Sequence, residues 1–98
     1  MFRSRFLTSH ALVLIYIMRN PSATLREAAQ HTGLTERTVH KILGDLRWDG
    51  FLAKRKNGRR NEHLVNEHVT LGRRMLGSMT VSQLVAALAA VAAAVERQ

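Results

Sequence analysis

The first hydrophobic stretch of the chain, residues 7–19, repeats its apolar positions at helical spacing and ends just before the only proline. Leu14 and Met18 belong to one apolar face, and Val13 and Ile17 belong to a second. This spacing predicts an amphipathic helix, and two apolar faces predict two packing partners. We therefore expect the helix to pack within its own domain and against a partner chain.

Two helix-start signals follow in close succession and predict helices over residues 25–32 and 36–49. Thr24 and Glu27 have the spacing of a capping box, in which each satisfies a backbone amide at the start of the first helix. Thr35 is placed to cap the second helix, where apolar residues recur at i, i+3, i+4 and i+7. A glycine lies between the two, where a left-handed residue suits a helix end. Two capped helices joined by a short turn indicate a helix-turn-helix.

After residue 50 the helical period gives way to short extended runs around "KRKNGRRN", residues 54–61. Five of the first seven residues of this run are cationic. Asn57 and Gly58 form the dipeptide typical of a two-residue type I′ turn, so residues 51–66 predict a basic β-hairpin with this pair at its turn. The basic run has two other interpretations: a localisation signal, or a charged strand edge that prevents aggregation.

The C-terminal third predicts a loop over residues 67–78, with one helical turn, and then a helix over residues 80–95. Thr80 and Gln83 form a second capping box at the start of that helix. Its apolar seam spans about two heptads, too short for a free-standing coiled coil, so it needs a partner. Packing within one chain stays open, but we expect a homodimer whose interface is formed by Leu12, Ile15, Val81, Leu84, Leu88, Val91 and Val95.

The order of these elements defines the expected fold class: mainly α with a small β-hairpin, in the order α-α-α-β-β-α. The chain has 98 residues, which suits one small domain over residues 1–98. A helix, a capped helix, a glycine turn, a second capped helix, a basic hairpin and a closing helix together predict a winged helix-turn-helix.

Charge then narrows the class of partner. The chain carries a formal net charge of +8 and a pI near 11.5, which favours polyanions, nucleic acid first and an anionic membrane second. There is no cysteine, which fits a reducing compartment. The N-terminal segment resembles a signal peptide but has no small-residue cleavage pattern, and no apolar run reaches the roughly 18 residues that span a bilayer. We expect a cytoplasmic protein.

The fold predicts which side chains would contact double-stranded DNA. A helix-turn-helix lays its second helix in the major groove, with residues near the helix start against the base edges. Arginine and lysine give the commonest specific contact, to guanine, whereas threonine suits phosphates or a thymine methyl group. We call the predicted helix over residues 36–49 the recognition helix and the hairpin over residues 51–66 the wing. On the recognition helix the expected contacts are Thr35, Arg37, Thr38, His40 and Lys41. On the wing they are Lys54, Lys56, Asn57, Arg59 and Arg60.

Other chemistries find little support in the residues. His63 and His68 lie close in sequence, but no cysteine or acidic cluster completes a metal site, and we expect no metal and no cofactor. No motif places a nucleophile beside a base, so we expect no enzyme. RNA binding by base stacking needs exposed aromatic residues. Trp48 is the single candidate, and we expect it to pack at the helix end.

Residues 25–66, "LREAAQHTGLTERTVHKILGDLRWDGFLAKRKNGRRNEHLVN", resemble the winged-helix domain of MarR-like and ArsR-like bacterial transcriptional regulators. The wing motif "GRRN" followed by "LVN" is similar to a small stand-alone subgroup of them. The resemblance implies a homodimeric, sequence-specific DNA-binding regulator, a repressor or an activator, with repressor as our preference. One departure is His63, where similar wings often carry a tyrosine. A winged-helix adaptor for protein interactions is the alternative function, followed by an RNA-binding module.

Overall fold

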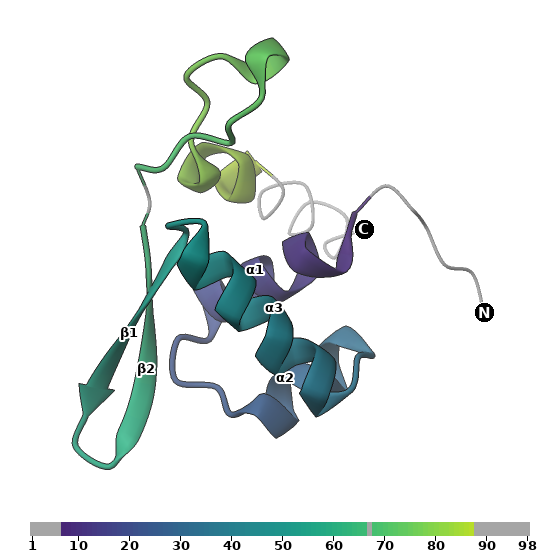
Figure 1. Ribbon diagram of the computed structural model, residues 1–98, viewed down its shortest axis with the longest axis vertical. Helices are drawn as coiled ribbons and strands as arrows, with labels where there is room; N and C mark the ends of the chain where they lie inside the picture. The colour runs from purple at the N-terminus through teal and green to yellow at the C-terminus, as the bar shows by residue number, and fades with distance from the viewer. Residues whose placement is uncertain (1–6, 67, 88–98) are drawn as a thin grey trace, which may run out of the picture. The chain divides into compact units, whose positions relative to one another are not determined.

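The computed structural model describes residues 7–66 and 68–87 of the chain. The chain forms two compact units, Met1–Val65 and Asn66–Gln98. The first unit contains three helices and one β-hairpin, and the second contains a loop and the start of a further helix (Figure 1). The order α-α-α-β-β-α is therefore the one that the sequence predicts. The single domain over residues 1–98 stays a prediction.

The three helices of the first unit are α1 (Ser9–Arg19), α2 (Leu25–Thr32) and α3 (Glu36–Trp48), and a threonine side chain caps each of them. At the start of α2, Thr24 Oγ1 accepts the Glu27 amide at 3.1 Å while Glu27 Oε1 accepts the Thr24 amide at 3.4 Å. This arrangement confirms the predicted capping box. Gly33 ends α2 with φ of 76°, a left-handed conformation that glycine adopts without a side-chain clash.

The core of the first unit lies where the three helices meet. It contains Val13 and Ile17 of α1 and the small Ala28 of α2, which allows the helices to approach closely. The i, i+3, i+4, i+7 positions of α3 complete it, and these are Val39, Ile42, Leu43 and Leu46. Burial of this face fixes α3 in rotation, so its polar residues are held on the remaining sides.

The hairpin pairs β1 (Leu52–Asn57) with β2 (Arg60–Val65) in antiparallel fashion; β1 contacts α3 and β2 contacts α1. Asn57 pairs with Arg60, so the two turn residues are Gly58 and Arg59. The prediction of Asn57 and Gly58 at the turn is therefore wrong by one residue. Among described residues only glycines have positive φ, and Gly58 has φ of 65°. A glycine at the first turn position is the type II′ preference, whereas type I′ needs positive φ at both.

The second unit is built around one short antiparallel bridge. Thr70 pairs with Thr80, and a 3-10 turn, η1 (Arg74–Leu76), lies in the loop between them. Residues 81–87 are helical and begin with the predicted capping box, in which Thr80 Oγ1 accepts the Gln83 amide at 3.2 Å and the Thr80 amide donates to Gln83 Oε1 at 2.9 Å. The rest of the expected helix lies outside the described residues.

Candidate nucleic-acid interface

The buried face of α3 leaves two polar stripes on the helix, because successive residues are turned by about 100°. One stripe carries Glu36, His40 and Arg47, at i, i+4 and i+11. The other carries Arg37, Lys41 and Trp48, at the same intervals and fully opposite the core. Each stripe therefore offers a different set of side chains to a partner.

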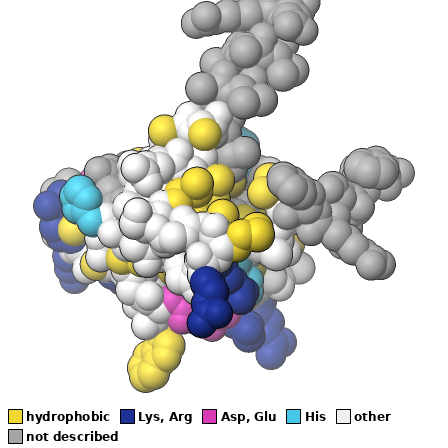
Figure 2. Space-filling model, turned by 90° about the horizontal axis from the view of Figure 1, so that it is seen from above, with side chains coloured by type: hydrophobic (Ala, Val, Ile, Leu, Met, Phe, Trp, Pro, Cys, Tyr) yellow, Lys and Arg dark blue, Asp and Glu magenta, His cyan; other side chains and the backbone are white. Residues whose placement is uncertain are grey.

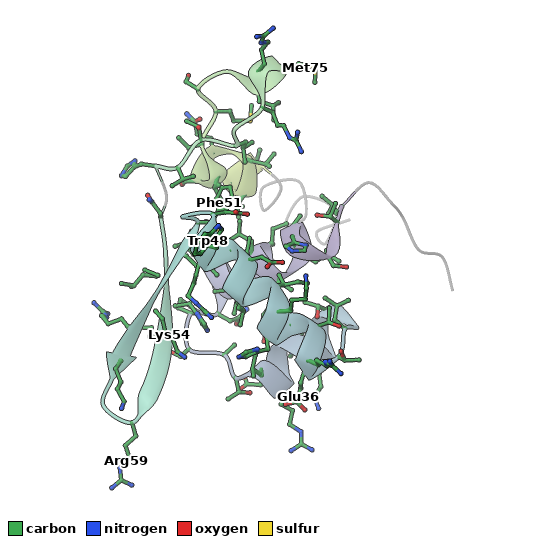
Figure 3. The ribbon with its side chains drawn as sticks, viewed as in Figure 1. Glu36, Trp48, Phe51, Lys54, Arg59 and Met75 are labelled. Atoms are coloured by element: carbon green, nitrogen blue, oxygen red, sulfur yellow. The ribbon has the colours of Figure 1, made fainter. Side chains whose placement is uncertain are left out.

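The first stripe lines a groove of about 490 Å³ that lies within the first unit, between α3, α2 and the hairpin. Its cationic lining comes from four elements: Arg26 of α2, Arg47 of α3, Lys54 of β1 and Arg59 of the turn. Figure 3 shows Lys54 on the strand beside α3 and Arg59 projecting from the tip of the hairpin. Glu36, at the start of α3, is the acidic residue in this lining. A polyanion would therefore meet cations from both walls of the groove.

The structure describes the side chains of three of the five predicted wing residues. Lys54, Lys56 and Arg59 are exposed, as a phosphate contact requires. The side chains of Asn57 and Arg60 lie outside the described residues. Arg55 lies on the same hairpin and forms an ion pair with Glu62. The distance from Arg55 Nη2 to Glu62 Oε2 is 3.2 Å. Arg55 thus already has an acidic partner on the hairpin.

The predicted DNA contacts on the recognition helix differ in whether their polar groups already have a partner within the protein. Arg37 and His40 are exposed on α3. The hydroxyls of the two threonines are engaged in the helix cap: Thr35 Oγ1 accepts the Thr38 amide at 3.1 Å and donates to Thr38 Oγ1 at 2.9 Å. Their expected contacts with DNA stay a prediction, and in this structure their evident role is to start α3.

Lys41 is held by a neighbouring carboxylate. Its Nζ atom lies 3.4 Å from Oδ2 of Asp45, one turn along the helix, and the same oxygen accepts a 2.8 Å hydrogen bond from Nε2 of His10 on α1. The hydrogen bond from His10, followed by the charge of Lys41, lowers the pKa of Asp45 below its ordinary value of 3.8. Asp45 is therefore ionised near neutral pH and offsets part of the positive charge of the outward stripe.

His63 occupies the wall of the groove on β2. Its side chain is only 8% exposed, its Nδ1 atom has no hydrogen-bond partner, and its amide donates to the Pro21 carbonyl at 3.0 Å. The hairpin register places it directly opposite Lys54. Burial lowers the pKa of His63 below 6.5, and the charges of Arg47 and Lys54 lower it further. The imidazole is consequently neutral at pH 7.

Sequence reasoning missed Arg26, Arg47 and His63 as lining residues of this groove. Arg47 could have been found from its spacing, because it lies eleven residues after Glu36 and so falls on the same side of α3. Arg26 and His63 had no such signal, since they come from α2 and β2 and meet only through tertiary packing.

Trp48 differs from its prediction. It was expected to pack at the end of the recognition helix, but its side chain is 91% exposed. The reason is its position: it lies in line with Arg37 and Lys41, on the side of α3 opposite Val39 and Leu46. A large indole on this outward stripe is available to a partner of the helix.

The expected dimer residues are found in several environments. Leu12 is 37% exposed and Leu84 is 38% exposed, Ile15 is half-buried, and Val81 is buried. The remaining three, Leu88, Val91 and Val95, lie outside the described residues. Their shared role in dimerisation stays a prediction.

Basic side chains outnumber acidic ones on the face of the molecule that Figure 2 shows. In residues 7–66 and 68–87, no three His, Asp or Glu side chains gather closely enough to hold a metal ion. Over the same residues, no helix has the length and apolar character needed to cross a membrane.

Comparison with known proteins agrees with the fold. Residues 10–52 match the family model described as winged helix-turn-helix DNA-binding. This range takes in most of α1, all of α2 and α3, and the first residue of β1. No curated protein sequence matches the chain. The helices and the paired hairpin together form a winged helix-turn-helix, and the family match supports DNA as the partner.

Proposed function

We propose that the protein is a sequence-specific transcriptional regulator that binds double-stranded DNA with α3 in the major groove and the hairpin as its wing. The observation that carries this proposal is that cations from α3 and from the hairpin line one groove of a single compact unit. A duplex that meets the outward stripe of α3 would bring a phosphate strand toward that groove. Both elements could then contact the same duplex.

The two parts of this surface would have different tasks. Arg37 is an exposed cation near the start of α3, and it would read a base edge. Lys54 and Arg59 would contact phosphates or a narrow minor groove, and so would supply affinity that does not depend on sequence. The match to DNA-binding winged helices over residues 10–52 supports DNA as the partner, and the division of tasks is our proposal.

We also propose that the regulator is a homodimer. Leu12 and Ile15 lie on α1 beside a surface groove of about 780 Å³, which is also lined by Tyr16 and His31, whose rings stack with centroids 5.0 Å apart. An exposed leucine and a half-buried isoleucine in the lining of such a groove suit a protein interface. A two-fold dimer would address a pseudo-palindromic site with half-sites about one helical turn apart. Repression, a cytoplasmic location and membership of the small MarR-like or ArsR-like bacterial subgroup complete the proposal, and they rest on the resemblance of residues 25–66.

A selection experiment tests the proposal. Duplexes enriched from a random pool should share a sequence with two symmetric half-sites, and binding to random duplex should weaken steeply as salt rises. The Lys54→Ala/Arg59→Ala double variant should lose affinity for every duplex. An Arg73→Ala variant is the control, because it removes an exposed cation that lines neither of the two grooves.

One outcome would favour a protein-interaction adaptor instead. The exposed side chain of Trp48 suits a protein partner as well as DNA. If no duplex is enriched and affinity for random DNA is negligible even at low salt, DNA binding is rejected and the adaptor is the function to test next.

A further inference from the structure

His63 is an unusual residue to find in the wall of a cationic groove. Its side chain is more than nine-tenths buried, and its Nδ1 atom has no hydrogen-bond partner. A buried polar atom without a partner is unfavourable, because folding removes its water and puts nothing in its place. Such an atom in a native fold calls for an explanation. His63 also lines the groove, so the charge of a ligand in the groove would act on its imidazole.

The groups that face His63 come from every element around the groove. The charges of Arg47 on α3 and Lys54 on β1 both oppose protonation of the imidazole. The other titratable or charged groups of the lining are Arg26 of α2, Glu36 and His40 of α3, and Arg59 of the turn, whereas α1 contributes the apolar Ile17. The imidazole is therefore kept neutral by its cationic neighbours as well as by burial.

We propose that the groove between α3 and the hairpin is a phosphate-binding site in which His63 takes up one proton from solvent when a phosphate of the DNA backbone enters. This inference rests on the proposed function. A phosphate carries the charge that offsets the repulsion from Arg47 and Lys54, so the cation on His63 is no longer opposed. The imidazolium has a donor on both nitrogens, whereas the neutral ring has one.

Proton uptake makes DNA binding depend on pH in one direction. Because the bound state holds one more proton than the free state, affinity rises as pH falls through the range in which His63 titrates. A single linked proton changes affinity by at most about tenfold per pH unit. The salt dependence that arises from the other cations is separate, since their charge is constant over this range.

The first test compares three proteins on one random duplex of about 20 base pairs, at constant ionic strength, from about pH 5.5 to about pH 8. The wild type should bind about tenfold more tightly at the acidic end. His63→Gln should lose most of that increase, because glutamine cannot take up a proton. His68→Gln is the matched control, since His68 is an exposed histidine that does not line the groove, and it should keep the increase. Equal pH dependence in the wild type and in His63→Gln overturns the inference.

The second test uses the wild type alone, so it does not depend on how well a variant folds. The titration midpoint of the His63 imidazole, followed by NMR, should move to higher pH when the duplex is added. Millimolar inorganic phosphate should move it less, because one free anion lacks the neighbouring phosphates that hold the backbone in place. A midpoint that rises with inorganic phosphate but not with duplex overturns the assignment to DNA and leaves a small phosphorylated ligand as the occupant.

The two proposals fail in different ways. If the protein binds no duplex at any pH, the proposed function is wrong. If it binds DNA but the His63 midpoint is unchanged, the function stands and only the proton-linked phosphate site is rejected.

Discussion

The carboxylate of Asp45 accepts a 2.8 Å hydrogen bond from the imidazole of His10, which ties the first turn of α1 to the side of the recognition helix. The same oxygen lies 3.4 Å from the ammonium group of Lys41. One acidic residue thus joins α1 to α3 and restrains Lys41, one of the cations that we propose for contact with DNA. We therefore expect such pairings, as well as the number of cations, to set the strength of DNA binding.

Replacing Asp45 with asparagine should tighten binding to DNA of any sequence. Asp45→Asn keeps an acceptor for His10 but removes the charge that offsets Lys41, so affinity for random duplex should rise by about threefold. Asp49→Asn, with the same change of charge at the end of α3, is the control and should have a smaller effect. Fluorescence anisotropy at two salt concentrations measures both, and an equal gain would show that Asp45 acts only through net charge.

Arg37→Ala should relax sequence choice. Because Arg37 is exposed on the outward stripe of α3, its loss should cost about 1–3 kcal/mol at one base position of the selected site and little on random DNA. Competition between the selected duplex and single-base variants measures the change. Uniform weakening on all duplexes would instead make Arg37 a phosphate contact.

The wing variants should behave in the opposite way. Lys54→Ala/Arg59→Ala should weaken binding to selected and random duplexes alike and should lower the slope of log affinity against log salt by about 2. Arg55→Ala is the comparison on the same hairpin, and its effect should be smaller because Arg55 is paired with Glu62. A larger loss for Arg55 would mean that the pair opens when DNA binds.

Gly58→Ala should destabilise the protein by about 1–2 kcal/mol, since an alanine at φ of 65° suffers a clash that glycine avoids. Asn57→Ala should cost much less, because residue 57 is the last position of β1 in the observed register. Thermal unfolding of both variants measures the difference. A large loss of stability in Asn57→Ala would instead support the turn at Asn57 and Gly58 that the sequence predicts.

Without DNA, the free energy of unfolding should fall as pH drops below about 6.5, the ordinary pKa of histidine. The pKa of His63 is lowered in the folded protein, so the unfolded chain binds more protons below that pH and acid favours unfolding. The stabilising contribution is complete above about pH 6.5 and is lost as pH falls through the folded-state pKa. Urea denaturation at several pH values should show this dependence in the wild type and a weaker one in His63→Gln.

Much of this protein follows from its sequence alone. The capping boxes at Thr24 and Thr80, the glycine that ends α2 and the buried periodicity of α3 all depend on residues within about four positions of one another. Local geometry therefore determines them, and the fold class could be predicted. The charge of the chain, which belongs to composition, indicated a polyanionic partner in the same way.

Only the tertiary structure decided which charges act together. Arg26, Arg47 and Lys54 come from three elements and meet in one groove because the helices and the hairpin pack as they do. The burial of His63 and the restraint of Lys41 by Asp45 have the same origin. Side chains on separate elements converge through packing that no local pattern encodes. The sequence thus determined the kind of surface, and the packing determined which residues form it.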